Sequence, residues 1–119
     1  MEQILEKARE VGRLVSQSEE YRAFRRANER LSDDREAVGL INRLNEMQQT
    51  FARAVERGEE PPREEQEAFE GAAASLQGNA AYQAFEVARA NFERLMMRVD
   101  EEIAKGMEAG EQSRIILSS

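Results

Sequence analysis

The sequence of 119 residues contains no cysteine, no histidine and no tryptophan, and only two prolines. Without cysteine it offers no disulfide, no thiol nucleophile and no cysteine ligand for an iron–sulfur cluster. Without histidine it lacks the usual general base and the usual ligand of transition metals. No P-loop, dinucleotide-binding fingerprint or nucleophile–base pair is present either. We therefore expect no enzyme activity, no catalytic residues and no cofactor.

Long apolar runs are also missing, since none approaches the roughly 20 residues of a membrane-spanning helix. The opening stretch, MEQILEKARE, has no signal-peptide pattern, so the expected location is the cytoplasm, without membrane contact. The net charge of −7 disfavours direct nucleic acid binding. Residues 1–60 have a net charge of −2 and residues 61–119 of −5, and much of this excess lies in Glu59–Glu70.

Helical periodicity is present almost throughout, and strand-like alternation is absent. Apolar spacings of three and four predict helices over residues 2–16, 18–31, 34–57, 62–77 and 80–107. The predicted fold is all-α, a helical bundle with two long amphipathic helices and shorter ones, and we expect it to be dimeric. Residues 1–107 form the single predicted domain, and residues 108–119 a flexible tail.

The third predicted helix has the most regular apolar spacing. Its apolar residues follow a heptad pattern over two and a half repeats: Ala37, Leu40, Leu44, Met47, Phe51 and Ala54. Ser32 or Asp33 is the expected cap at its start. Gly58 is a plausible residue just beyond its end, and Pro61-Pro62 cannot continue it.

Two similar phrases occur 61 residues apart, SEEYRAF at 18–24 and NAAYQAF at 79–85. They either mark a shared site or are two ways of starting a helix. Ser18 and Asn79 are good helix caps, and the Tyr and Phe that follow them fall on the core side of a helix. We prefer the second interpretation, in which each phrase places an aromatic pair in a shared core. Eight residues are the candidates for core or interface positions: Tyr21, Phe24, Leu44, Phe51, Tyr82, Phe85, Phe92 and Leu95.

Two weaker strips are candidates for a partner surface. On the last predicted helix, Val87, Ala90 and Met97 fall opposite Phe92, where they form either an interface or ordinary scattered surface hydrophobes. The second predicted helix carries a basic strip that could meet phosphate or an acidic partner, although Glu19, Glu20 and Glu29 dilute its charge. The strip consists of Arg22, Arg25, Arg26 and Arg30.

The densest carboxylates, Glu64–Glu67 and Asp100–Glu102, raise the question of a metal site. A di-iron helical bundle uses Glu-x-x-His pairs that face inward, and this chain has no histidine. We interpret both groups as solvated helix faces and expect no metal.

The order of these features resembles the YlbF/YmcA/YheA family of small bacterial helical proteins. The similar stretches are ILEKAREVGRLVSQSEEYRAFRRANERL, DREAVGLINRLNEMQQTFARAVERGEEPPREE and NAAYQAFEVARANFERLMMRVDEEI. The resemblance extends over roughly residues 2–105. The resemblance lies in the whole pattern and in no catalytic motif. It implies an α-helical, homodimeric, cytoplasmic protein without catalytic residues.

Members of this family are linked to competence, sporulation and biofilm control as regulatory adaptors. Two of them join a third protein in a complex that directs an endoribonuclease and carries iron–sulfur clusters. Because this chain has no cysteine, it cannot supply cluster ligands, and it is closer to the YheA-like branch. The leading hypothesis is a non-enzymatic adaptor that acts through protein contacts. A structural homodimer without a regulatory partner and an RNA-processing accessory factor within a larger complex remain alternatives.

Overall fold

The chain forms five helices over the residues that the computed structural model describes, which are 1–118 for the backbone and 1–112 for the side chains. In chain order they are α1 (Glu2–Ser16), α2 (Glu19–Asp33), α3 (Arg35–Glu56), α4 (Arg63–Gln77) and α5 (Ala80–Ser118). No strand occurs among these residues, so the predicted all-α class is confirmed.

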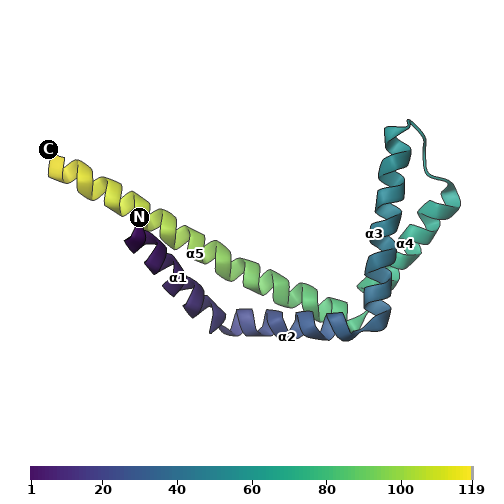
Figure 1. Ribbon diagram of the computed structural model, residues 1–119, viewed down its shortest axis with the longest axis horizontal. Coiled ribbons are helices and arrows are strands. Elements are labelled where there is room, and N and C mark those ends of the chain that lie inside the picture. The colour runs from purple at the N-terminus through teal and green to yellow at the C-terminus, as the bar shows by residue number, and fades with distance from the viewer. Residues whose placement is uncertain (119) are drawn as a thin grey trace.

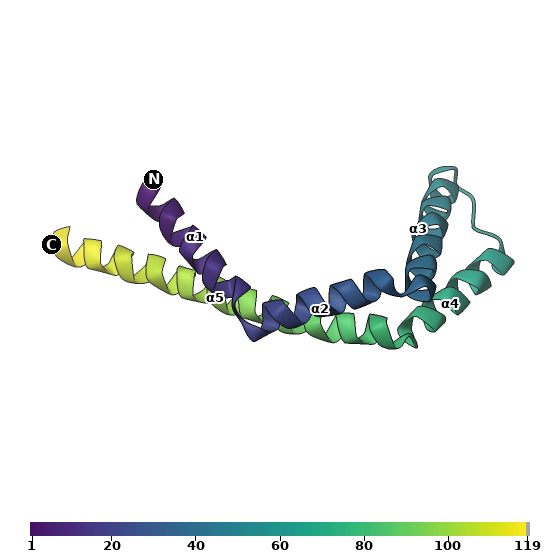
Figure 2. The ribbon, with the colours of Figure 1, turned by 60° about the horizontal axis from the view of Figure 1, so that its bottom comes forward.

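The helices form a long body with an arm at one end (Figure 1). In the body, α2 runs antiparallel to α5, and these two helices have the most extensive contact in the chain. The arm is the hairpin of α3 and α4, which rises from the junction of α2 and α5. Beyond α2, α1 diverges from α5 in the view of Figure 2.

Both aromatic phrases are capped helix starts, as the sequence predicted. The hydroxyl of Ser18 accepts a hydrogen bond from the backbone N–H of Tyr21 at 3.1 Å. The side-chain oxygen of Asn79 accepts one from the N–H of Tyr82 at 2.9 Å. Each bond satisfies a backbone donor that the first turn of a helix leaves without a partner.

The start of α3 differs from the sequence prediction. The cap is Asp34, whose carboxylate accepts a hydrogen bond from the N–H of Ala37 at 3.0 Å, and not Ser32 or Asp33. Both of those residues belong to the last turn of α2, so the break between the two helices is a single extended residue. Capping propensity alone could not choose among three adjacent polar residues that all cap well.

Gly58 ends α3 as expected. Its φ of 73° lies in the left-handed region that L-residues with a side chain rarely adopt. The N–H of Glu59 donates to the carbonyl of Ala54 at 2.8 Å, and that of Gly58 donates to Val55 at 3.0 Å. These two bonds form a Schellman motif, which satisfies the last carbonyls of the helix.

The last helix is longer than predicted, since α5 continues to Ser118 instead of ending near residue 107. Gly106 and Gly110, which lie near the predicted end, are both within the helix. A glycine costs a helix about 1 kcal/mol relative to alanine without forbidding the conformation, and no proline follows to stop it. The predicted flexibility of residues 108–119 stays a prediction.

A small core lies where the arm meets the body. Leu31, Ala37, Leu76 and Ala81 are buried there, one from each of the helices α2 to α5. Partly buried side chains surround them, among them Leu40, Ile41, Leu44, Tyr82 and Phe85. No large side chain among those described is fully buried, so this core is small for a chain of this length.

The molecule is extended. It measures 69 × 37 × 23 Å, and its radius of gyration is 21.8 Å. A compact domain of this length would have a radius of gyration of about 13.5 Å. No helix in the described part of the chain is long and apolar enough to cross a membrane.

Candidate functional site

An aromatic cluster joins α2 to α5. The ring centroid of Phe24 lies 5.6 Å from that of Phe85 and 5.3 Å from that of Phe92, and both pairs have an edge-on arrangement. Tyr21 contacts Phe92 at 5.6 Å. All four rings stay half-buried, because the body is only two helices thick and no described part of the chain covers their outer side. Phe24 of the first predicted pair meets Phe85 of the second, at a surface and not in an enclosed core, while Tyr82 lies outside this cluster.

The other four core candidates lie elsewhere, and all are half-buried. Leu44 and Tyr82 pack against the small core at the junction of arm and body. Phe51 contacts Phe69 across the arm, with ring centroids 5.5 Å apart. Leu95 lines an opening between α2 and α5. The eight predicted residues are therefore spread over four places and form no single site.

The space between α1 and the middle of α5 is open and largely apolar. An opening of about 680 Å³ is lined by Val11, Leu95, Val99 and Ile103, with charged residues at its rim. None of the α1 residues is buried. The apolar stripe of α1 and the second half of the α5 stripe therefore face solvent in the single chain.

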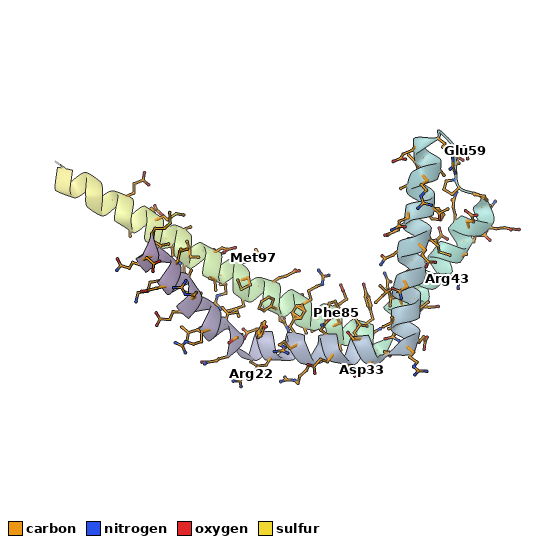
Figure 3. The ribbon with its side chains drawn as sticks, in the orientation of Figure 1. Arg22, Asp33, Arg43, Glu59, Phe85 and Met97 are labelled. Atoms are coloured by element: carbon orange, nitrogen blue, oxygen red, sulfur yellow. The ribbon has the colours of Figure 1, made fainter. Side chains whose placement is uncertain are left out.

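The predicted strip on the outside of α5 is only partly continuous. Val87 and Met97 are 63% and 61% exposed, while Ala90 is half-buried. Figure 3 shows Met97 and Arg22 on opposite edges of the body, on α5 and α2 respectively. The apolar strip on α5 and the basic strip on α2 therefore do not form one continuous surface along their whole length.

The basic strip on α2 is partly neutralised within the helix. A guanidinium nitrogen of Arg26 lies 3.1 Å from a carboxylate oxygen of Glu19, and one of Arg25 lies 4.0 Å from Glu29. Arg22 has no carboxylate within ion-pair distance among the described side chains, and Arg30 has none either. The strip is thus weaker than its four arginines suggest.

A groove runs along one face of α2 and α5. It consists of two adjoining openings of about 420 and 320 Å³, which share Ala23 and Asn91 in their lining. Small side chains form its floor, and Val87 stands at its edge. Four arginines line it, two from each helix: Arg26, Arg30, Arg94 and Arg98. We call this feature the α2–α5 groove.

The α2–α5 groove brings together residues that the sequence placed in separate strips. Arg26 and Arg30 come from the basic strip, and Val87 from the strip on α5. Arg94 and Arg98 were not singled out, because the periodicity of one helix does not show which face of another helix packs beside it. The available signal was a set of alanines at matching positions in and just after the two phrases, namely Ala23 and Ala27 on α2 and Ala84 and Ala88 on α5.

A polar contact at the junction of arm and body was also not predicted from the sequence. The side-chain amide of Asn79 donates to the carboxylate of Asp34 at 3.4 Å, so the caps of α5 and α3 touch. The hydrogen bond from the N–H of Ala37, and secondarily that from Asn79, holds the pKa of Asp34 below its usual value. This contact helps to fix the arm on the body.

The arm has its own shallow groove, of about 410 Å³, on the side where Arg43 lies in Figure 3. Met47, Phe51 and Ala68 provide its apolar lining, and Glu64 and Glu65 stand at its edge. Within the described residues, no three acidic side chains come close enough to hold a metal ion.

Comparison with known proteins shows a matching family and a similar solved structure. A family model described as "Control of competence regulator ComK, YlbF/YmcA" matches residues 4–108. The fold is similar to that of RicA in the X-ray crystal structure of Bacillus subtilis RicA in complex with RicF, with a TM-score of 0.79. The two chains are 20% identical over 89% of this chain and 94% of that chain, which shows the fold alone. No curated protein sequence matches the chain significantly. Because the family model spans most of its length, the chain belongs to the YlbF/YmcA family of regulatory proteins.

Proposed function

We propose that this chain is a non-enzymatic cytoplasmic adaptor that works as a homodimer and regulates through protein contacts. The family is described by its control of the competence regulator ComK, which is a regulatory and not a catalytic role. RicA, whose fold is similar, was crystallised in complex with another protein, RicF. A protein–protein role for the present chain agrees with both observations. Its assignment to the YheA-like branch stays a prediction.

The observation that carries the proposal is the surface that the single chain leaves exposed. Its accessible area is 9529 Å². A compact monomer of this mass would expose about 6,600 Å². If each of two copies buried this excess of about 2,900 Å², the interface would total about 5,800 Å², at the upper end of what obligate dimers bury, which is about 2,000–5,000 Å² or more in total. A second copy would supply the core that the thin body lacks.

The exposed apolar side chains support the same conclusion, since they concentrate on α1 and on the second half of α5. Ile4 is 70% exposed, Leu14 54%, Ile103 54% and Met107 67%. Scattered surface hydrophobes are ordinary, but two facing helices with unburied apolar stripes are typical of an interface. We propose that these helices contact a second copy of the chain.

Light scattering coupled to gel filtration tests the dimer. At tens of micromolar, we expect a mass about twice the 13.6 kDa of one chain. A mass of one chain over that concentration range would refute the proposal.

Affinity capture from the native cell then separates an adaptor from a dimer without partners. The tagged wild-type chain should retain a defined partner at fixed stoichiometry after washing in moderate salt. The matched bait is Ile103→Glu, which changes an exposed apolar residue that a second copy would cover in the proposed dimer. If neither bait retains a protein other than the chain itself, the adaptor role is wrong and the structural homodimer remains.

A further inference from the structure

We propose that the outer face of α4 from a second copy lies in the α2–α5 groove, held by the groove's arginines. This inference rests on the proposed homodimer and names a surface next to the apolar opening between α1 and α5, with which it shares Leu95 and Arg98. Three properties of the two surfaces support it, namely charge, size and relief.

The charges of the two surfaces are opposite. Four arginines and two glutamates line the groove, which gives it a net charge of +2. One of the arginines, Arg26, is paired with Glu19. Arg30, Arg94 and Arg98 have no carboxylate within ion-pair distance among the described side chains.

The segment from Glu59 to Glu70 comprises the loop before α4 and the first part of that helix, and it carries six glutamates against one arginine, a net charge of −5. The charged residues on the outer face of α4 itself are Arg63, Glu67 and Glu70, which give that face a net charge of −1. Two of the segment's glutamates form ion pairs within the chain, Glu59 with Arg57 and Glu67 with Arg63. The others have no basic partner among the described side chains. The arm carries this charge away from its own body, since Glu59 lies at the far end of the arm in Figure 3.

The two surfaces also agree in length. Along α2 the groove runs from Glu19 to Arg30, which is twelve residues and about 18 Å of helix. The outer face of α4 runs from Arg63 to Ala74, which is also twelve residues. On that face Arg63, Glu67, Glu70 and Ala74 follow spacings of four, three and four, and all are exposed.

Both surfaces are low in relief, which allows two helices to approach closely. The floor of the groove consists mainly of alanines, of which Ala27 and Ala88 are almost fully buried beneath it. The outer face of α4 presents Gly71 and Ala74 beside its glutamates, and a methyl group added at Gly71 would meet no atom of the chain. Helix separation depends on the side chains at the contact, so small residues on both sides favour close packing.

Symmetry makes the contact self-consistent. Each chain has one groove and one acidic face, so two copies related by a two-fold axis can satisfy both contacts at once. A chain cannot satisfy them alone, because its own arm points away from its body (Figures 1 and 2). The groove is therefore complete only when the partner copy contributes α4.

Charge exchange between copies tests the pairing. One variant, Arg26→Glu with Arg30→Glu, makes the groove acidic, and the other, Glu67→Arg with Glu70→Arg, makes the face of α4 basic. Each variant alone faces like charges at both contacts, so its dissociation constant should rise about 10- to 100-fold. In an equimolar mixture both contacts are complementary again, and heterodimers should form at close to the wild-type affinity.

Sedimentation equilibrium measures these constants, and circular dichroism verifies that each variant keeps its helix content. The matched control is Arg43→Glu with Arg53→Glu, which makes the same change of charge on α3 and should shift the constant by less than about twofold. If the variants dimerise like the wild type, or if mixing restores nothing, the pairing is wrong while the dimer stands. If the wild-type chain is monomeric, the proposed function fails instead.

The absence of cysteine permits a second test that does not depend on affinity. Chains carrying Val87→Cys at the edge of the groove are mixed with chains carrying Ala74→Cys on α4. Under mild oxidation they should form a covalent heterodimer, while Val87→Cys mixed with Asn45→Cys, on the exposed side of α3, should not. Equal cross-linking of both mixtures, or of neither, would overturn the pairing even if a charge variant failed to fold.

Discussion

Phe24 and Phe92 each contact two aromatic rings, more than any other described residue. Phe24 packs edge-on against Phe85 and Phe92. Phe51, on the arm, contacts only Phe69. Each aromatic pair contributes about 0.5–1.5 kcal/mol beyond the area that it buries. All of these rings are half-buried, so part of the cost of truncating a fully buried Phe is absent.

We therefore predict that Phe24→Ala lowers the free energy of unfolding by about 2 kcal/mol or more, and that Phe51→Ala lowers it by less. Urea denaturation at one fixed protein concentration measures both values. Phe51→Ala is the matched control, because it removes the same side chain at the same degree of burial. A loss below about 0.5 kcal/mol for Phe24→Ala would show that the aromatic cluster contributes little to folding.

Two further single residues, Asp34 and Asn79, contribute to stability through the contact between the caps of α3 and α5. Because the pKa of Asp34 is lowered in the folded chain, its charged form contributes stability above the unfolded pKa of about 3.9. That contribution is lost as the pH falls through the lower, folded pKa.

The difference in stability between the wild type and Asp34→Ala should therefore be constant near neutral pH and shrink below about pH 4. Urea midpoints measured from pH 7 to pH 3 would show this. Asn79→Ala is the comparison: it should cost about 1 kcal/mol through the lost cap at pH 7. A smaller part of this cost than for Asp34→Ala should disappear below about pH 4, since only the secondary hydrogen bond from Asn79 to Asp34 depends on the charge of that carboxylate. A difference for Asp34→Ala that persists undiminished at pH 3 would contradict the assignment.

At the scale of the helix, the sequence predicted the elements well and their ends less well. The bounds of α1 and the Schellman end at Gly58 follow from local signals, namely apolar spacing and a glycine before two prolines. The predicted end of α5 was wrong, because the glycines near residue 107 weaken a helix without stopping it. The cap of α3 was off by one residue among three polar candidates, where tertiary contact with Asn79 favours Asp34.

Two glycines of the arm should respond in opposite ways to the same substitution. Gly39 lies inside α3, is exposed, and has open space where a methyl group would go. Gly39→Ala should stabilise the chain by about 0.5–1 kcal/mol through the helix propensity of alanine. Gly58→Ala should destabilise it by about 1–2 kcal/mol, because alanine is strained at a φ of 73°.

Urea denaturation of both variants at the same concentration measures these changes. Each variant serves as the control for the other, since the added methyl group is identical. The same sign of change for both would show that backbone conformation does not decide the outcome at Gly58.

At the scale of the whole molecule, the sequence could not show how the helices are arranged. The heptad stripe of α3 is used within the chain, where Phe51 meets Phe69 of α4, although the same spacing would fit a coiled coil between chains. Periodicity gives the apolar face of a helix but not its partner. For that reason the α2–α5 groove and the open space beside α1 became visible only in three dimensions.

The last prediction concerns the stability of the assembled molecule. If a second copy completes the core, folding and association are linked, and the melting temperature must depend on protein concentration. A hundredfold rise in concentration adds about 2.7 kcal/mol, which corresponds to about 5–10 °C for a dimer of this size.

Ile103→Glu should lower the melting temperature, and more strongly at low than at high concentration. Ile103 is already 54% exposed in the single chain, so a charge there is costly only where a partner covers it. The matched control is Val55→Glu on α3, at an aliphatic residue that is 68% exposed and lies away from α1 and α5. Differential scanning calorimetry over the concentration series measures both effects. A melting temperature independent of concentration would mean that the extended chain folds alone, and the proposed second copy would not be part of its core.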